Sequence, residues 1–115
     1  MRRGEVWTAA GGGDYAAKPR PVVIVQDDAF DATASITVCP LTTNPQDAPL
    51  FRLFVEPSEL NGLRNPSRLM IDKIATVPRT KLGVRLGRLD DAKILQLNLA
   101  IMVFLGLAGS GRRKG

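Results

Sequence analysis

Arg20 is the residue in this chain best placed to act on a phosphate group. It stands between Pro19 and Pro21, whose rings fix the backbone on either side, and directly before an apolar, β-branched run at residues 22–26. A guanidinium held at the mouth of a strand is a rigid, permanently charged fork that fits a phosphate. Taken alone, the same pattern is also typical of a solvated arginine at the edge of a strand.

Two hydroxyls and an amide follow the next apolar run, since Thr42, Thr43 and Asn44 come directly after residues 36–41. Such groups at the mouth of a loop can donate hydrogen bonds to a bound anion. They are also common in turns, where their side chains bond to nearby backbone groups. The trio therefore supports a phosphate site only in combination with Arg20.

The chain has 115 residues with no histidine and one cysteine, Cys39. This composition excludes a Ser–His or Cys–His nucleophile, a histidine-based zinc site and an imidazole acid–base pair. Any catalysis must use arginine, lysine, carboxylate, hydroxyl or phenol groups. A lone cysteine also excludes an intramolecular disulfide, which is typical of a reducing compartment, and we expect a cytoplasmic protein.

Two further patterns are better explained by local structure than by ligand binding. Asp27, Asp28 and Asp31 could attract a divalent cation, but their spacing matches no calcium loop, and aspartate is common in turns. The triple glycine at residues 11–13 lies close to Lys18, but a P-loop needs a glycine directly before the lysine and a Ser or Thr after it. We therefore expect neither a metal ion nor a cofactor.

The net charge of +5 is concentrated at the C-terminal end, because Arg112, Arg113 and Lys114 leave only +2 for residues 1–111. A basic balance is compatible with a nucleic-acid partner but does not establish one. The first residues are charged rather than apolar, and the longest apolar run, residues 99–108, is too short to span a bilayer. We expect one domain at residues 1–108, a basic flexible tail at residues 109–115, and no membrane association.

Short apolar or alternating segments, separated by Gly, Pro and Asp, predict a mainly β domain. The predicted strands are residues 5–8, 22–26, 36–41, 51–56, 68–74 and 84–89. Pro40 is expected near the end or the edge of its strand. Many short strands followed by one terminal helix predict a small, curled β-barrel with the helix packed on it.

The one long helix is predicted at residues 92–108, with Asp90 or Asp91 as its N-cap. One side of it carries an apolar stripe of Ile94, Leu97, Ile101, Phe104 and Leu105. The opposite side is apolar as well, with Leu95, Leu99, Met102 and Val103. A helix that is apolar on most sides is either deeply buried or shared with a second subunit, and we expect a homodimer.

Three segments carry a resemblance to a known family. They are Arg3-Gly4-Glu5-Val6-Trp7, Lys18-Pro19-Arg20-Pro21-Val22-Val23-Ile24-Val25-Gln26 and Pro40-Leu41-Thr42-Thr43-Asn44. Their order and spacing, followed by Asn61-Gly62-Leu63, Arg79-Thr80-Lys81-Leu82 and the terminal helix, resemble the MazF/PemK (Kid) family of toxin endoribonucleases. The resemblance covers about residues 2–107.

The resemblance implies an SH3-like barrel, shared by MazF, PemK and CcdB-like proteins, that forms a homodimer. It implies metal-independent, sequence-specific cleavage of single-stranded RNA, in which a ribose 2′-OH attacks the adjacent phosphate and leaves a 2′,3′-cyclic phosphate and a 5′-OH. The family's catalytic arginine and threonine match Arg20 and Thr42. The positions that match RNA-binding residues of the family are Glu5, Lys18, Thr43, Asn44, Ser67, Asp72 and Lys73.

The resemblance also implies a partner, a cognate MazE-like antitoxin with an acidic C-terminal segment. An acidic, partly disordered segment suits a basic RNA channel, because opposite charges steer association. Glu5 or Asp72, if partly buried, is a candidate general base, since arginine keeps its proton in proteins.

The sequence departs from the family in the parts that help to select RNA sequence. Asp14 stands where many relatives have Glu, and Lys73 stands where many have Gln. Met70 replaces an active-site arginine of a Kid-like relative. Tyr15 could stack on a base, although a loop tyrosine is more often simple packing. The cleavage sequence of a relative therefore cannot be transferred to this chain.

Two other functions remain open at the level of sequence. A CcdB-like toxin shares the fold but poisons DNA gyrase by binding it, without nuclease chemistry. The presence of both Arg20 and Thr42 argues against that alternative. A barrel that binds RNA without cutting it is the second alternative, and substitution of Arg20 would separate binding from cleavage.

Overall fold

The computed structural model describes residues 1–10, 18–45 and 51–108 of the chain. The strands are β1 (Glu5–Ala9), β2 (Arg20–Ile24), β3 (Ser35–Thr42), β4 (Arg52–Val55), β5 (Ser67–Met70), β6 (Ala75–Pro78) and β7 (Leu82–Arg88). The helices are η1 (Asp28–Phe30), η2 (Ile71–Lys73), η3 (Arg79–Lys81) and α1 (Asp91–Phe104), the first three being single 3-10 turns. The predicted tail and the loop with Asp14 and Tyr15 lie outside the described residues.

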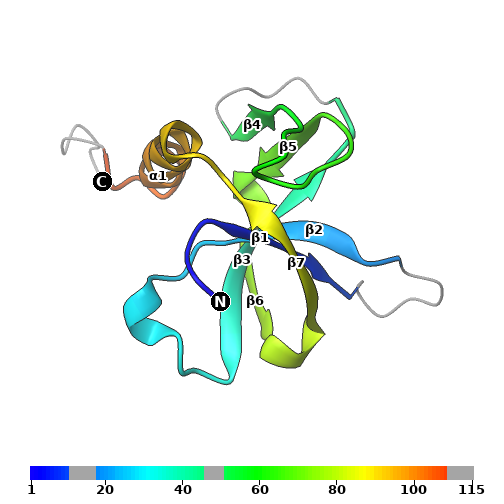
Figure 1. Ribbon diagram of the computed structural model, residues 1–115. Coiled ribbons are helices and arrows are strands. Elements are labelled where there is room, and N and C mark those ends of the chain that lie inside the picture. Colours follow the sequence, from blue (N-terminus) through cyan, green and yellow to red (C-terminus); the bar gives the residue numbers. More distant parts are fainter. Residues whose placement is uncertain (11–17, 46–50, 109–115) are drawn as a thin grey trace.

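The strands form one antiparallel sheet in the order β4-β5-β3-β2-β1-β7, and β6 pairs with β3 as well. β3 is the central strand, with β2 along one side and β6 followed by β5 along the other. Figure 1 shows the sheet curling around β3, with β4 and β5 at one end and β6 and β7 at the other. The pairings among the described residues do not close the sheet into a ring. The prediction of a mainly β, barrel-like domain with a C-terminal helix is confirmed.

The two faces of β3 are buried in two separate apolar clusters. The smaller cluster contains Val22, Ile24, Ile36 and Val38. The larger cluster, which includes the helix, contains Val6, Val23, Cys39, Leu41, Val55, Leu69, Ile71, Leu89, Leu97 and Ala100. Successive residues of a strand point to opposite faces, so a strand that is buried on both faces is continuously apolar. This explains the uninterrupted apolar runs at residues 22–25 and 38–41.

Pro40 lies two residues before the end of β3, as predicted. At this point the partner of β3 changes, because Val38 is paired with Ala75 of β6 and Leu41 with Leu69 of β5. A proline cannot donate to a sheet hydrogen-bond ladder, and it is tolerated where one ladder ends and the next begins.

The predicted strand at residues 68–74 is wrong in its second half. β5 ends at Met70, the chain turns through η2, and β6 begins at Ala75. Ile71 is buried in the larger cluster, and its amide donates to the Phe51 carbonyl. The apolar run Leu69-Met70-Ile71 is typical of a strand, but the turn allows the chain to leave the end of β3 and pair with its beginning.

Helix α1 is capped by the Asp90 side chain, which accepts from the Lys93 amide. The helix ends at Phe104 rather than at the predicted residue 108. Gly106 adopts a φ of +79°, a left-handed conformation that glycine tolerates and that ends a helix. No helix in the described ranges is long and apolar enough to cross a membrane.

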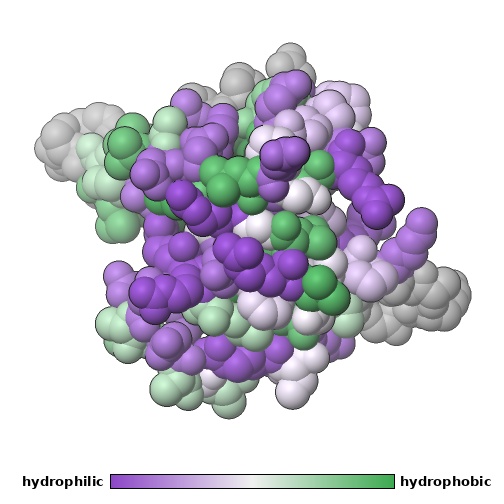
Figure 2. Space-filling model, viewed as in Figure 1, coloured by the Kyte–Doolittle hydropathy of each residue, from purple (hydrophilic) through white to green (hydrophobic). Residues whose placement is uncertain are grey.

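The helix buries only one narrow side in the sheet. Leu97 and Ala100 are its buried residues. The exposed apolar side chains of the helix and the turn after it are Leu95, Leu99, Met102, Val103, Phe104, Leu105 and Leu107. Figure 2 shows apolar residues gathered at the left edge of the molecule, where Figure 1 places α1.

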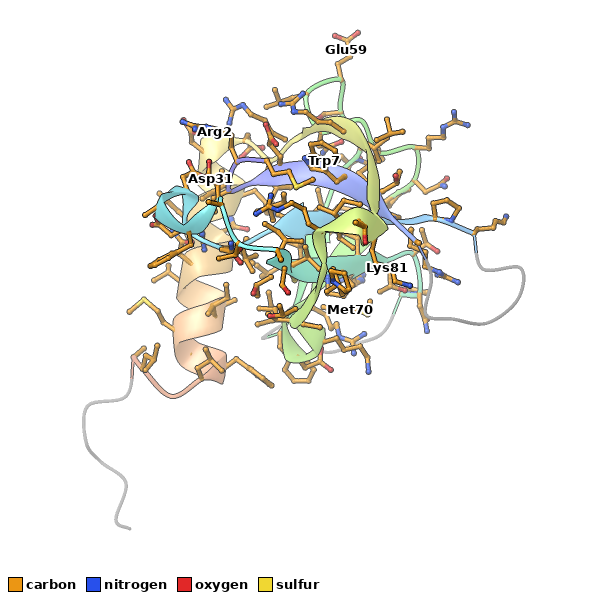
Figure 3. All side chains as sticks on the ribbon, turned by 90° about the horizontal axis from the view of Figure 1, so that it is seen from below. Arg2, Trp7, Asp31, Glu59, Met70 and Lys81 are labelled. Atoms are coloured by element: carbon orange, nitrogen blue, oxygen red, sulfur yellow. The ribbon has the colours of Figure 1, made fainter. Side chains whose placement is uncertain are left out.

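The segment from Glu56 to Ser67 is held against β7 by backbone contacts. Arg88 donates from its amide to the Leu60 carbonyl, and the Asn61 side chain bonds to three backbone groups within the segment. Glu59, at the tip, points away from the body of the molecule (Figure 3). A Cβ at Gly87 would overlap the carbonyl oxygen of Leu60 and the backbone of Asn61. The close approach of this segment to β7 therefore requires glycine at position 87.

We expect Gly87→Ala to lower the free energy of unfolding by about 1–3 kcal/mol, because the added methyl group forces backbone apart in a packed contact. Urea denaturation followed by circular dichroism measures the change. Val84→Ala is the matched control, since Val84 lies in the same strand and is 61% exposed. Equal stabilities of the two variants would show that the segment does not depend on this contact.

Candidate active site

The pairing of β2 with β3 brings Arg20 next to Thr42. Val22 is paired with Pro40, and Ile24 with Val38. Continuing this register by two positions places Arg20, the first residue of β2, opposite Thr42, the last residue of β3. The ladder itself ends at Val22 and Pro40, and the alternation of both strands puts Arg20 and Thr42 on one face. The two residues that the sequence singled out therefore lie on the same face at the ends of neighbouring strands.

The Thr42 hydroxyl is already oriented by the backbone. Its Oγ1 accepts a hydrogen bond of 3.1 Å from the amide of Asn44. A hydroxyl has one proton to donate in addition to its acceptor sites. With one acceptor site taken, the proton of Thr42 is available for a donor contact to a bound anion. Asn44 contributes here through its backbone, and its side chain is exposed.

Arg20 is exposed at the open end of the smaller cluster. It lies on the same face of β2 as Val22 and Ile24, which are buried, and is paired with Ala9 of β1. Arg20 and Thr42 thus lie directly beyond the edge of the smaller cluster. A guanidinium supported by a rigid strand and open to solvent on its far side can bind a phosphate without first breaking an internal contact.

The neighbouring strand β5 adds a second guanidinium to this face, which the sequence reasoning missed. Thr42 is paired with Arg68, and Arg68 is paired with Phe54 of β4. The Arg68 guanidinium carbon lies 5.5 Å from the centre of the Phe54 ring. The signal in the sequence was the alternation in Ser67–Met70, where Arg68 stands between the buried residues Ser67 and Leu69. We call the line Arg20, Thr42, Arg68 and Phe54 the cross-strand row.

A cavity of about 300 Å³ lies beside the ends of β2 and β3. Its lining consists of Thr8, Pro19, Pro21, Thr43, Gly62, Leu63, Arg64, Asn65, Ser67 and Leu86. Thr43 and Ser67 were predicted to contact RNA, and the structure brings them together here. Ser67 is buried and donates from its hydroxyl to the Asn65 carbonyl at 2.9 Å. Thr43 directly follows Thr42, the last residue of β3, so the cavity and the cross-strand row meet at the same strand end.

Glu5 lies apart from Arg20. Its carboxylate accepts from the Arg2 amide at 2.9 Å, the Trp7 indole at 2.9 Å and the Arg85 guanidinium at 3.0 Å. Burial raises the pKa of this carboxyl, but these donors outweigh burial and leave the pKa below its usual value. Glu5 is four residues along β1 from Ala9, the partner of Arg20, which is about 13 Å of strand.

Asp72 is held by a buried arginine that the sequence reasoning did not single out. Arg52 donates to both carboxylate oxygens of Asp72, at 2.9 and 3.0 Å, and the Arg52 side chain is only 8% exposed. The hydrogen bond from Arg52 lowers the pKa of the Asp72 carboxyl. The remaining predicted residues, Lys18 and Lys73, are both exposed, Lys18 two residues before Arg20 and Lys73 at the end of η2.

Two other candidate groups have structural roles. Burial raises the pKa of the Cys39 thiol to about 12, so it stays protonated at neutral pH. The predicted polar turn at Asp27–Asp31 is confirmed, since Asp27 caps η1 by accepting from the Ala29 amide. Asp28 accepts from the Arg3 amide at 2.7 Å. In the part of the chain that the structure describes, no group of three or more His, Cys, Asp or Glu is arranged to hold a metal ion.

The fold and the site define a class, a small curled β-sheet domain with an arginine and a threonine paired at the open end of its central strands. A family model of the PemK-like, MazF-like toxins of type II toxin–antitoxin systems matches residues 2–105. The chain belongs to this family. The identity of its catalytic and RNA-binding residues remains the prediction made from the sequence.

Known relatives agree with this assignment along nearly the whole chain. The chain is 55% identical over 109 residues to a probable endoribonuclease MazF of Mycolicibacterium smegmatis, covering 95% of this chain and all of that protein. A mycobacterial endoribonuclease solved in complex with its cognate antitoxin has a TM-score of 0.77 and 27% identity, covering 96% of this chain and 99% of its own. The Mycobacterium tuberculosis toxin MazF-mt6 has a TM-score of 0.76 and 26% identity, covering 89% of this chain and 96% of its own.

We expect Asp72→Asn to lower the free energy of unfolding at pH 7 by up to about 3 kcal/mol, because it leaves the buried Arg52 charge without a counter-ion. The lowered pKa of Asp72 means that the ion pair contributes fully above about pH 4 and is lost as the pH falls further. The wild type should therefore lose more stability between pH 6 and pH 3 than the variant does.

Urea denaturation at several pH values measures both effects. Glu59→Gln is the control, because Glu59 is an exposed carboxylate that points into solvent (Figure 3). An identical pH dependence in the wild type and Asp72→Asn would mean that the pair contributes nothing to acid sensitivity.

Proposed function

We propose that this chain is a toxin that cleaves single-stranded RNA without a metal ion, with Arg20 and Thr42 as its catalytic residues. The observation that carries the proposal is the register of β2 and β3, which sets these two side chains on one face at the strand ends. The family membership and the relatives named as endoribonucleases support the reaction class. We assign the activity to a toxin domain at residues 1–108.

The proposed reaction begins with the ribose 2′-oxygen attacking the adjacent phosphorus. The bond from phosphorus to the 5′-oxygen breaks, which gives a 2′,3′-cyclic phosphate and a 5′-OH. The proton of the 2′-OH leaves to solvent, and the departing 5′-oxygen takes up a proton. Negative charge grows on the phosphate oxygens in the transition state, where fixed donors contribute most to catalysis. Arg20 supplies a charged, bidentate clamp, and the Thr42 hydroxyl adds one hydrogen bond.

Neither Glu5 nor Asp72 acts as the general base in this proposal. Both carboxylates are bound by arginines, and both have lowered pKa values, which make them poorer proton acceptors. Arg20 works through its positive charge and its hydrogen-bond donors. The attack uses the 2′-OH, so DNA is expected to resist cleavage.

The RNA-binding surface in this proposal extends from the strand ends to both sides. Lys18, Thr43, Asn44, Ser67 and Lys73 remain candidate contacts. The cavity that Thr43 and Ser67 line has room for a nucleobase next to the reacting phosphate. Such a pocket would select the base at one position of the cleavage sequence.

We further propose that the chain acts in the cytoplasm under the control of a cognate antitoxin. One mycobacterial endoribonuclease of the same fold was solved with its antitoxin bound. A MazE-like partner with an acidic C-terminal segment would be attracted to the same basic groups that bind phosphate. By covering them, it would exclude RNA.

The proposed form of the toxin is a homodimer built on the exposed side of α1. Leu95, Leu99 and Val103 are 63%, 61% and 55% exposed on this 14-residue helix. A contiguous apolar surface of this kind is a marker of protein association. A second copy of the same helix is the simplest complementary surface, since isologous contacts are the commonest among homo-oligomers.

We expect Arg20→Ala to reduce cleavage of a long single-stranded RNA by at least about 100-fold, because it removes the charged donor from the transition state. Thr42→Val should cost a similar factor, and Thr42→Ser should keep most of the activity because it retains the hydroxyl. The assay contains EDTA, and the fragment ends are mapped for 2′,3′-cyclic phosphate and 5′-OH.

Arg2→Ala is the control, since the Arg2 side chain is 69% exposed and lies 3.7 Å from the Asp28 carboxylate. Cleavage that survives Arg20→Ala would remove Arg20 from the mechanism. A folded wild type that cuts no RNA would rule out the nuclease, and inhibition of DNA gyrase or binding of RNA without cleavage would then be measured.

We expect Leu99→Glu to convert the homodimer into a folded monomer, because it places a charge in the middle of the apolar contact. Sedimentation equilibrium measures the mass, and circular dichroism checks the fold. Gln96→Glu is the matched control, since Gln96 is an exposed polar residue of the same helix. A wild type that is monomeric at every concentration would contradict the proposed dimer.

A further inference from the structure

The outer end of the cross-strand row is formed by an exposed aromatic ring and an arginine that lies against it. Phe54 is 41% exposed, although it stands between Leu53 and Val55, which pack into the larger cluster. The Arg68 guanidinium carbon is 5.5 Å from the centre of the Phe54 ring. The two residues are also directly paired between β4 and β5.

Core packing does not account for this arrangement. The alternation of β4 turns Phe54 away from the larger cluster and onto the outer face of the sheet. Among the described residues, no carboxylate lies within ion-pair distance of Arg68. Arg68 therefore presents a positive charge and a planar group next to the flat face of a phenyl ring.

The pair lies in line with the candidate catalytic residues. Arg68 is the direct partner of Thr42, and Phe54 is one strand further out. Neighbouring strands are about 4.8 Å apart, so Phe54 lies about 10 Å from Thr42 along the row. That separation places the pair beside a neighbouring nucleotide of an extended RNA chain, rather than at the reacting phosphate.

We propose that Phe54 and Arg68 form a stacking platform for one unpaired nucleobase of the RNA, with Arg68 also contacting the phosphate of that nucleotide. Aromatic side chains that stack on bases, combined with arginine, are the usual means by which proteins hold single-stranded nucleic acid. This inference rests on the proposed function for the identity of its ligand. The platform fixes the position of the chain, so that the next phosphate reaches Arg20 and Thr42.

The test measures binding separately from cleavage. The probe is a fluorescent pool of random-sequence, single-stranded 2′-O-methyl RNA of about 12 nucleotides, which cannot be cut because its 2′-oxygen is blocked. A stacked base contributes roughly 1–3 kcal/mol, so Phe54→Ala and Phe54→Leu should weaken binding by about 5- to 150-fold. Phe54→Leu keeps an apolar side chain of similar size, and circular dichroism checks that it folds.

Two further variants identify the kind of contact. Phe54→Trp should bind at least as well as the wild type, and its added indole fluorescence should be quenched by the bound RNA. Arg68→Gln should weaken binding and reduce the dependence of log K on log salt by about 0.7, the value for one phosphate contact on a single strand. Arg2→Ala is the control, because Arg2 is paired with Asp28 and Figure 3 shows it apart from Met70 of β5.

Cleavage kinetics on natural RNA separate this inference from the proposed function. Phe54→Ala should raise KM and leave kcat nearly unchanged, whereas Arg20→Ala abolishes cleavage. Wild-type affinity in the Phe54 variants, with cleavage intact, would overturn the platform and leave the nuclease standing. A wild type that binds no RNA would overturn both. The Phe54 variants could instead bind RNA as the wild type does and lose binding to a Glu/Asp-rich peptide. That result would assign the surface to an acidic protein partner and overturn the RNA platform.

Discussion

The antiparallel register between β2 and β3 is the constraint on which the candidate site depends. Arg20 and Thr42 are 22 residues apart in the chain, and only this register makes them neighbours. A slip of one residue would turn Arg20 toward the opposite face, where Val23 and Cys39 are fully buried. Burying an unpaired guanidinium there would cost several kcal/mol, so the apolar residues that fill the core also fix the geometry of the site.

β3 performs two tasks along its length. Its middle residues, Val38 and Cys39, are buried on opposite faces, which gives the strand a rigid position. Its last residue, Thr42, emerges where β2 begins, and the backbone of Asn44 orients its hydroxyl. Catalysis by fixed donors requires groups that need no reorganisation during the reaction. A hydroxyl at the end of a clamped strand meets that requirement better than one on a free loop.

Features that depend on local pattern could be predicted from the sequence. The strands around Val6, Val23 and Leu41, the cap at Asp90 and the exposed apolar side of α1 all follow from side-chain periodicity and capping chemistry. A joint role of Arg20 and Thr42 was implied by a family resemblance, since no local pattern reports which strands are neighbours.

Features that depend on distant contacts could not be predicted in this way. Arg52 lies in the predicted strand at residues 51–56, but no local pattern indicates that it is buried against Asp72, which comes 20 residues later. The turn after Met70 interrupts an apolar run that is typical of a strand, because β3 offers two pairing sites in succession. Arg68 becomes a candidate RNA contact only because its neighbours on the adjacent strands are Thr42 and Phe54. These three outcomes are set by tertiary pairing, which overrides local preference.

The distribution of charge connects these contacts with the site. Residues 1–111 carry a net charge of only +2, too little to make the whole surface attractive to a polyanion. Glu5 and Asp72 are, however, bound by Arg85 and Arg52, while Arg20 and Arg68 face outward on one side of the sheet. The internal ion pairs thus neutralise carboxylates that would otherwise repel phosphate. A modest net charge is sufficient for RNA because Arg20 and Arg68, which form no ion pair in the described part of the chain, lie on one face of the sheet.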